Sequence, residues 1–410
     1  MKVSVNALAS LFAAALLSFS LVSCDDELAN EPTPTPDVEN PSLDGTTLKG
    51  GELKGNVLLK AGTKYTLDGA VLVTEGSSLT IEQGVTLEAK EGFQNYILVE
   101  KGGKIFVKGT ASAPVVMTCV NKRPGAWGGL ILNGKSHINE GSTTQTEINS
   151  DIAYGIPANQ DFVNDDNSGS IEYLVLEYTG AAVNADIEHN GLTLNAVGNG
   201  TKIENIFVYK SSDDGVEFFG GSVNVKNFLS VDNYDDMFDF TQSYDGTLSN
   251  AYGIWNADHV STEEDPRGIE ADGNHDGKYP EAAHQSDFTV DGLTIALYGD
   301  MNAGPEFLAE KGVQAVLKIR RGCSADIRNF RLIGSGKSST IIDAADGKGE
   351  GLNVTVSLDK SGYTGETGDY KTGAKTVLNV SEDANEGTPQ SLFAWTGYDF
   401  ASNAYTSKAK

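Results

Sequence analysis

The stretch that decides the fold is SSDDGVEFFGG at residues 211–221, which is echoed by NYDDMFDF at residues 233–240. Each stretch places a pair of aspartates ahead of a short apolar run that contains one further carboxylate, and the two copies lie 22 residues apart. Acidic groups on a short buried strand are costly unless they face water, a cation or a ligand. We therefore ask which fold stacks this arrangement at such an interval, and what the carboxylates contact.

Short apolar runs with a regular spacing continue along most of the chain. A second strand type contains I/V-x-N and recurs as IENIFVY at 203–209, VKNFLSV at 225–231, LSNAYGI at 248–254 and IRNFRLI at 327–333. The runs are separated by turn residues, and glycine occurs 47 times, which favours an all-β chain with many turns. A motif that recurs at a fixed interval of this size is typical of a solenoid.

We predict a parallel β-helix, in which equivalent positions of successive coils stack about 4.8 Å apart. Inward apolar side chains then form a ladder, for which the candidates are Val216, Phe218, Phe238 and Phe240. Asn205 and Asn227 fit an asparagine ladder at a bend. A β-sandwich or a propeller is the alternative, but sandwiches rarely hold one motif at a fixed period and propeller blades need about 40 residues each.

The N-terminal residues have the features of an export signal and a tether. Residues 1–23 contain one basic residue and then an apolar stretch, so we assign them to a signal peptide. The sequence LVSC at 21–24 resembles the lipobox of bacterial lipoproteins, which implies that Cys24 is acylated and anchors the chain in a membrane. The acidic residues that follow resemble the signal for the outer face of the outer membrane in Bacteroidota. Residues 24–50 are rich in proline and predict a flexible tether.

The charge and the cysteine content exclude several classes of partner. The formal net charge of −27 disfavours binding of nucleic acid or anionic lipid through the overall field, whereas cations and neutral glycans suit an acidic protein. Besides Cys24 the chain has only Cys119 and Cys323, which make neither a disulfide framework nor a zinc motif. We expect these two to be separate buried thiols.

Three motifs taken in order resemble a known group of proteins. They are GAWGGLILNGKSHINEG at 125–141, the acidic repeat at 211–246 and RGIEADGNHDG at 267–277. Together they resemble the secreted right-handed parallel β-helix surface lipoproteins of Bacteroidota and other Gram-negative bacteria. The resemblance covers most of residues 51–334 and implies a right-handed β-helix at the cell surface, with no biochemical activity attached. We expect the β-helix to span residues 51–391.

The acidic residues of successive coils should stack in this fold. A register of 22 places Asp213 under Asp235, Asp214 under Asp236 and Glu217 under Asp239, and Glu270 follows in the next acidic strand. Glu217, Asp239 and Glu270 alternate with apolar neighbours and should point outward. Like charges about 5 Å apart repel by about 1 kcal/mol or more, so a cation, Arg267, raised pKa values or ligand hydroxyls should offset the repulsion. The alternative is that the aspartate pairs are only bend residues.

Basic and aromatic residues extend this candidate site. The segment LKIRRG at 317–322 adds Lys318 and Arg320 to the same face one coil further on. An acidic and then basic strip suits an elongated polar ligand such as a glycan, and four aromatic residues are expected nearby: Tyr234, Tyr244, Tyr252 and Trp255.

A calcium site is the cofactor hypothesis. DGNHDG at 272–277 has the spacing of the first half of a calcium loop, with Asp272, Asn274 and Asp276 at alternate positions. The twelfth position is Ala283, so an EF-hand is not supported, and a plain Asx-turn is the alternative.

Three classes of function remain open. The leading prediction is an outer-membrane-anchored surface lipoprotein that binds a glycan or another extracellular ligand without catalysis, with a TonB-dependent outer-membrane transporter as the candidate partner. The alternative is a β-helix polysaccharide lyase or glycoside hydrolase with calcium, in which Arg267, Lys318 or Arg320 abstracts a proton. A structural surface-layer component is the third class. Binding leads because the carboxylates persist over three coils while a complete catalytic set does not appear, and fold analogy alone does not decide.

The C-terminal residues 392–410 are aromatic and predict a cap. Phe393, Trp395, Tyr398 and Phe400 lie close together in sequence. A solenoid needs its open end covered, because exposed strand edges pair with other chains. We expect this segment to cover that end; an aromatic platform for a ligand is the alternative.

Overall fold

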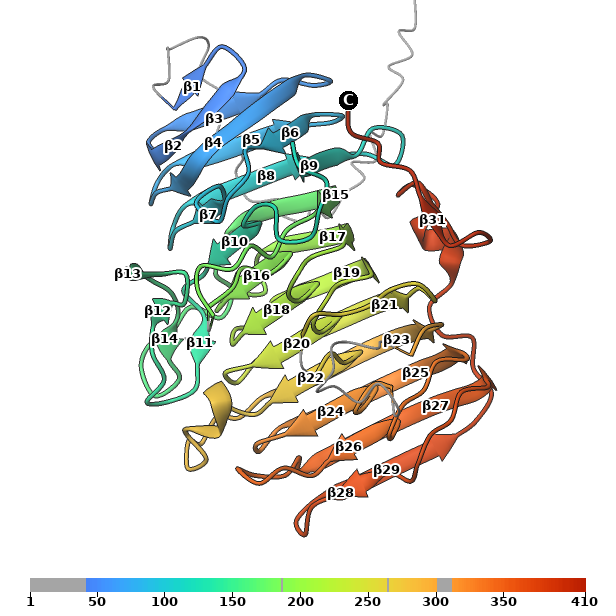
Figure 1. The fold of residues 1–410 in the computed structure, drawn as a ribbon. Helices are drawn as coiled ribbons and strands as arrows, with labels where there is room; N and C mark the ends of the chain where they lie inside the picture. Colours follow the sequence, from blue (N-terminus) through green and yellow to red (C-terminus); the bar gives the residue numbers. More distant parts are fainter. Residues whose placement is uncertain (1–41, 186, 264, 301–311) are drawn as a thin grey trace, which may run out of the picture. The chain divides into compact units, whose positions relative to one another are not determined.

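The computed structural model describes residues 42–410 except for 186, 264 and 301–311. The predicted signal peptide, Cys24 and most of the predicted tether therefore lie outside the described residues. Strand structure starts at Leu43, inside the segment expected to be tether. Twenty-five of the described strands belong to one sheet, in which successive coils pair in parallel (Figure 1). The predicted parallel β-helix is confirmed.

Each coil of the central and C-terminal part contributes one long bent strand and one short strand. The long strands are β15 (Gly169–Glu177), β17 (Lys202–Tyr209), β19 (Asn224–Val231), β21 (Thr247–Trp255), β23 (Asp287–Leu297), β25 (Ser324–Gly334), β27 (Asn353–Tyr363) and β29 (Val377–Glu382). The short strands are β10 (Leu130–Asn133), β16 (Leu192–Asn195), β18 (Val216–Phe219), β20 (Phe238–Thr241), β22 (Ile269–Asp272), β24 (Leu317–Arg320), β26 (Ile342–Ala344) and β28 (Lys371–Thr372). Each long strand pairs with the long strand of the next coil, and each short strand pairs with the next short strand. The coils therefore advance by one strand spacing per turn.

The N-terminal coils continue the same stacks. Their strands are β1 (Leu43–Asp44), β2 (Thr47–Leu53), β3 (Asn56–Leu59), β4 (Lys64–Val73), β5 (Ser78–Glu82), β6 (Thr86–Ala89), β7 (Ile97–Val99), β8 (Lys104–Lys108) and β9 (Val115–Cys119). β1 turns back antiparallel on β2, and Leu43 packs against the main core at this end. Leu48 and Leu53 are fully buried there.

The remaining elements lie outside the two stacks. An insertion after β10 contains β11 (His137–Ile138), β12 (Gln145–Thr146), β13 (Asn149–Ala153) and β14 (Ile156–Pro157), and the last residues contain β30 (Tyr398–Asp399) and β31 (Ala404–Tyr405). The two short 3-10 helices are η1 (His275–Gly277) and η2 (Gln390–Phe393). In the part of the chain that the structure describes, no helix has the length and apolar character needed to cross a bilayer.

The register predicted from the sequence is the one in the structure. Ile203 pairs with Val225, and Glu217 pairs with Asp239, each 22 residues further along the chain. The inward side chains of these coils form aromatic stacks in the core. The rings of Phe218 and Phe240 lie 4.9 Å apart and nearly parallel. Cys119 and Cys323 are free and buried, as expected.

An asparagine ladder holds the bend of the long strands. Asn205, Asn227 and Asn250 have φ values of 60°, 58° and 56°, which asparagine tolerates better than most residues. The Nδ2 of Asn227 donates to Oδ1 of Asn205 at 2.9 Å, and Nδ2 of Asn250 donates to Oδ1 of Asn227 at 2.8 Å. Each side chain therefore satisfies the next one, and the bend is repeated from coil to coil.

We expect Gly215→Ala to destabilise the fold, because Gly215 lies at the tight turn that leads into β18. A Cβ there meets Nδ2 of Asn233 at 2.5 Å and the carbonyl oxygen of Met237 at 2.6 Å. Overpacking of this kind costs about 1–3 kcal/mol in free energy of unfolding. Gly347→Ala is the matched control, since nothing lies within 4 Å of its Cβ position. Equal denaturation midpoints for the two variants would contradict the packing described for this turn.

The segment predicted to be a cap runs along the side of the solenoid instead. We call residues 385–410 the C-terminal strap. The backbone N–H of Thr388 donates to Thr294 on β23, Tyr398 donates to Asn256 just after β21, and the N–H of Lys410 donates to Thr86 on β6. Figure 1 shows the strap returning from the last coils toward the first ones. Its course therefore does not cover the C-terminal end.

The reason for this course is an outward apolar row on the long strands. Val175 pairs with Phe207, Phe207 with Leu229 and Leu229 with Tyr252, and all four side chains are buried although they face away from the interior of the helix. They form one cluster with the strap side chains Phe393, Trp395 and Tyr398. Apolar surface of this extent needs a cover, and the aromatic residues of the strap provide it.

Candidate functional site

The turns that enter the short strands gather the predicted carboxylates on one face. The parallel register places Glu217 beside Asp239, Asp239 beside Glu270 and Glu270 beside Lys318. The backbone N–H of Asp236 donates to Oδ1 of Asp214 at 2.9 Å, which stacks the two aspartate turns as expected. The backbone N–H of Arg267 continues the pattern by donating to Oδ1 of Asp236 at 2.6 Å. One function of the Asp-Asp pairs is therefore to tie successive turns together.

The stacked carboxylates and Arg267, but not Lys318, line an open cleft of about 390 Å³. Among the described residues its lining contains twelve carboxylates and two arginines, which gives a formal charge of −10 if all are ionised. The carboxylates are Glu147, Glu188, Asp213, Asp214, Glu217, Asp235, Asp236, Asp239, Glu263, Asp265, Glu270 and Asp276, and the arginines are Arg267 and Arg320. We call this the acidic cleft. Such a concentration of one charge suits cations and opposes free anions.

Two carboxylate triads in the acidic cleft have the spacing of a metal site. One triad is Asp213, Asp214 and Asp235, and the other is Asp214, Glu217 and Asp239; within each, the oxygens lie within 4.8 Å of one another. Asp214 belongs to both triads and is almost fully buried. One carboxylate oxygen of Asp235 and one of Asp239 are buried without a hydrogen-bond donor. A divalent cation in this cleft would give those oxygens the partner that they lack.

The carboxylates of the triads are hard to ionise without such a partner. Removal from bulk water raises the pKa of all five well above the usual range, and the neighbouring carboxylates raise it further. Asn190 partly opposes this by donating from Nδ2 to Oε2 of Glu217 at 2.7 Å. At the rim, burial raises the pKa of Glu188 to about 7, and Glu263 adds to the shift.

The basic residues at one end of the cleft are already paired. Arg267 is almost fully buried and donates to Glu270 and Asp265. Arg320 donates to Glu270 and, at 2.8 Å, to Asp272. Contact with these carboxylates raises the pKa of both guanidinium groups above an already high value, in spite of their burial. Lys318 lies at 3.2 Å from Asp343 and donates to the carbonyl oxygen of Ala345.

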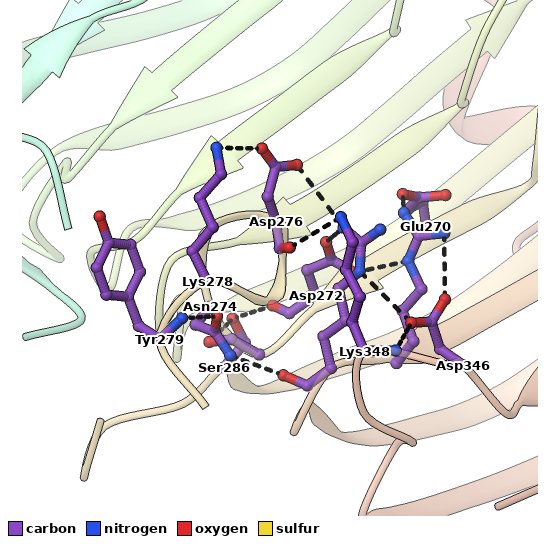
Figure 2. Close-up of polar contacts among 12 residues, drawn as sticks. Glu270, Asp272, Asn274, Asp276, Lys278, Tyr279, Ser286, Asp346 and Lys348 are labelled. Atoms are coloured by element: carbon purple, nitrogen blue, oxygen red, sulfur yellow. Dashed lines mark hydrogen bonds and ion pairs between the residues drawn. The ribbon is translucent and has the colours of Figure 1, made fainter. Parts of the chain in front are cut away.

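The predicted calcium loop at residues 272–276 has other partners (Figure 2). Arg320 and Arg321 bind the carboxylate of Asp272, and Lys278 binds that of Asp276 at 2.8 Å. Oδ1 of Asn274 accepts the backbone N–H of Tyr279 at 2.8 Å, which is the behaviour of a turn residue. The three side chains of the predicted loop therefore form an ion-pair and turn network with Lys278 of the same loop and with Arg320 and Arg321 of the next coil, and the metal-like triads lie elsewhere.

Most of the aromatic residues expected beside the ligand are buried. Tyr244, Tyr252 and Trp255 have at most 2% of their surface exposed. The ring of Tyr244 packs in the core against Phe218, Tyr252 lies under the strap, and Trp255 donates to the carbonyl oxygen of Asn233. Tyr234 is half-buried, with its ring against His259. The expectation that Tyr244, Tyr252 and Trp255 lie beside the ligand is therefore wrong.

Several residues of the cleft were not expected from the sequence. Glu147 comes from the insertion after β10, Glu188 from the loop before β16, and Glu263 and Asp265 from the loop before β22. They lie in irregular segments far apart in sequence and share no repeat with the ladder. Only the lengths of these loops, which interrupt the 22-residue spacing, indicate that something is built beside the short strands.

The fold and this cleft define the class: a parallel β-helix protein with a carboxylate-lined face. Residues 51–401 match the family model described as a pectate-lyase-like β-helix domain. The chain therefore belongs to that family. No curated protein and no solved structure matches the chain.

Proposed function

We propose that this chain is a lipid-anchored outer-membrane surface protein that binds a divalent cation in the acidic cleft and, together with it, a polar extracellular ligand such as a glycan. The observation that supports the proposal is the pair of triads that share Asp214, with buried and unpartnered oxygens on Asp235 and Asp239. Calcium is the favoured ion, because it accepts six to eight oxygen ligands in flexible geometry.

The raised pKa values of the cleft carboxylates support a site in which a bound cation replaces protons. Groups with raised pKa values keep their protons to a higher pH than ordinary carboxylates do, which lowers the charge of the cleft below its formal value over that pH range. Cation binding then has to displace those protons, and its affinity rises with pH. The rim residue Glu188, with a pKa of about 7, places part of this change near neutrality.

The ion pairs of Arg267, Arg320 and Lys318 favour ligand binding without catalysis over the polysaccharide lyase alternative. A general base works best when its pKa lies near the working pH. Arg267 and Arg320 have raised pKa values because carboxylates surround them. Burial lowers the pKa of Lys318, but its ammonium group is bound to Asp343 and to a backbone carbonyl. None of these three is poised to abstract a proton from a sugar ring.

Calorimetric titration with calcium tests the proposal. We expect binding whose apparent enthalpy depends on the ionisation enthalpy of the buffer, because protons leave the carboxylates as the ion enters. Asp214→Asn should lower the affinity by at least about tenfold, since both triads lose a ligand. Asp291→Asn on the exposed face of β23 is the control and should bind as the wild type does.

A glycan array read with and without a chelator then tests the second part. Retention of a glycan that is lost both on chelation and in Asp214→Asn is the expected result. Calcium binding without retention of any glycan would limit the function to the cation, and the absence of calcium binding would overturn the proposal.

A further inference from the structure

The two ends of the solenoid differ in how they are closed. At the N-terminal end the first rungs of the core, Leu48 and Leu53, have no exposed surface. At the other end the last inward rung is made by Leu378 and Val380 of β29, and both are only half-buried. Their partners one coil earlier, Val354 and Val356, are at most 1% exposed. Among the residues that the structure describes, the inward side chains are therefore partly exposed at the C-terminal end of the core and buried at its N-terminal end.

The open end also presents an unpaired strand edge. β29 pairs in parallel with β27, and within the described residues it has no strand on its other side. The N–H groups of Val377 and Asp383 donate to carbonyl oxygens of the β27 coil. Since N–H direction alternates along a strand, the N–H and C=O groups of residues 378, 380 and 382 point away from β27. The strap, which was expected to cover this edge, lies along the side instead.

We infer that a second copy of this chain covers the open end, by antiparallel pairing of β29 with β29 across a two-fold axis at Asn379. This inference is independent of the acidic cleft. An axis at that residue pairs position 378 of one copy with position 380 of the other. Leu378 then meets Val380 of the second copy, and the outward N–H and C=O groups of both residues are satisfied.

The charges beside the strand fit the same axis. Lys375 lies in the turn that leads into β29 and Asp383 follows the strand directly, so the axis brings Lys375 of one copy near Asp383 of the other, and the symmetry makes this contact twice. Both side chains are exposed in the single chain. The two interior cores then become continuous through the paired rungs. Because each copy contributes one strand of six residues, the contact is small, and we expect a weak, concentration-dependent dimer.

Variants that invert the charge of Lys375 or of Asp383, studied alone and as a mixture, test the contact between these two residues. The full chain is studied by sedimentation in a non-ionic detergent, so that a lipid on Cys24 does not itself cause association. Lys375→Asp and Asp383→Lys should each lower the association constant by more than about tenfold, because each places like charges together twice. An equimolar mixture of these two variants should associate again as a heterodimer. Lys60→Asp, an exposed position near the N-terminal end, is the control.

A cross-link tests the axis itself. Residues that face each other in a non-hydrogen-bonded antiparallel pair lie about 4.5 Å apart at Cα, a distance that a disulfide spans. Asn379→Cys should therefore form an intermolecular disulfide under mild oxidation, whereas Val377→Cys, two residues from the axis, should not. A wild-type chain that stays monomeric at high concentration, or equal cross-linking of both variants, would overturn the inference.

Discussion

Replacing Trp395 by alanine should lower the free energy of unfolding by about 3–5 kcal/mol, the range found for large aromatic side chains deleted from cores. Trp395 lies in the strap, has 6% of its surface exposed and meets the ring of Tyr173 edge-on with the centroids 5.3 Å apart. It belongs to the cluster that covers the outward apolar row of the long strands. Its removal leaves a cavity between the strap and the sheet.

The control for this prediction is Val260→Ala, at a residue that is 50% exposed and should lose less than about 0.5 kcal/mol. Chemical denaturation of the two variants and the wild type gives the comparison. If Trp395→Ala unfolds at the wild-type midpoint, the strap does not contribute to the stability of the solenoid. Increased binding of a hydrophobic dye by Trp395→Ala in the native range would show directly that the apolar row has been uncovered.

The second large effect concerns the acidic cleft. A rise in pH should lower the melting temperature of the protein, and a cation bound in the cleft should raise it. The carboxylates of the triads have pKa values raised above those of the unfolded chain. Their contribution to stability is therefore fully present below the unfolded values near pH 4 and is lost as the pH rises through the folded values. For Glu188 that loss extends to about pH 7. In a chelator, the melting temperature should fall as the pH rises over this window.

Calcium should reverse the loss, because it binds the folded and ionised form. A ligand present at 1,000 times its dissociation constant stabilises a protein by about 4 kcal/mol. Asp239→Asn removes one of the interacting carboxylates, so the variant should be at least as stable as the wild type in chelator at pH 8 and should gain less from calcium. A melting temperature that is independent of both pH and calcium would mean that the cleft carboxylates are ordinary solvated groups.

The repeating part of the fold was predictable from the sequence because the motifs recur at the same residue interval at which the coils stack. Glu217 and Asp239 stand 22 residues apart both in the motif and in the paired strands. The asparagine ladder is visible in the same way, since Asn205 and Asn227 occupy equal places in their coils. The course of the strap was not predictable. Its aromatic residues fit a cap and a side cover equally well until Val175, Phe207 and Leu229 are known to face outward from the coils.

The stacked carboxylates of the candidate site were predictable from the sequence. The residues that reach the site from loops and from the next coil were not. Asp213, Asp214, Glu217, Asp235 and Asp239 follow from the register alone, and the structure brings them together. The calcium spacing at residues 272–276 suggested ligands, but a linear pattern does not reveal that Arg320 and Arg321 of the next coil reach Asp272. Glu188 and Glu263 enter from loops, and nothing in a periodic pattern fixes where a loop returns.

The strap also sets the order in which the molecule can be completed. The coils are local structures, each built on the one before, and such contacts form early. The strap follows all the coils in the sequence, yet Lys410 bonds to Thr86, 324 residues earlier. Until the strap has been synthesised, the outward apolar row of the long strands stays exposed to solvent. Folding of the coils therefore cannot be completed before the strap is available to pack along their side.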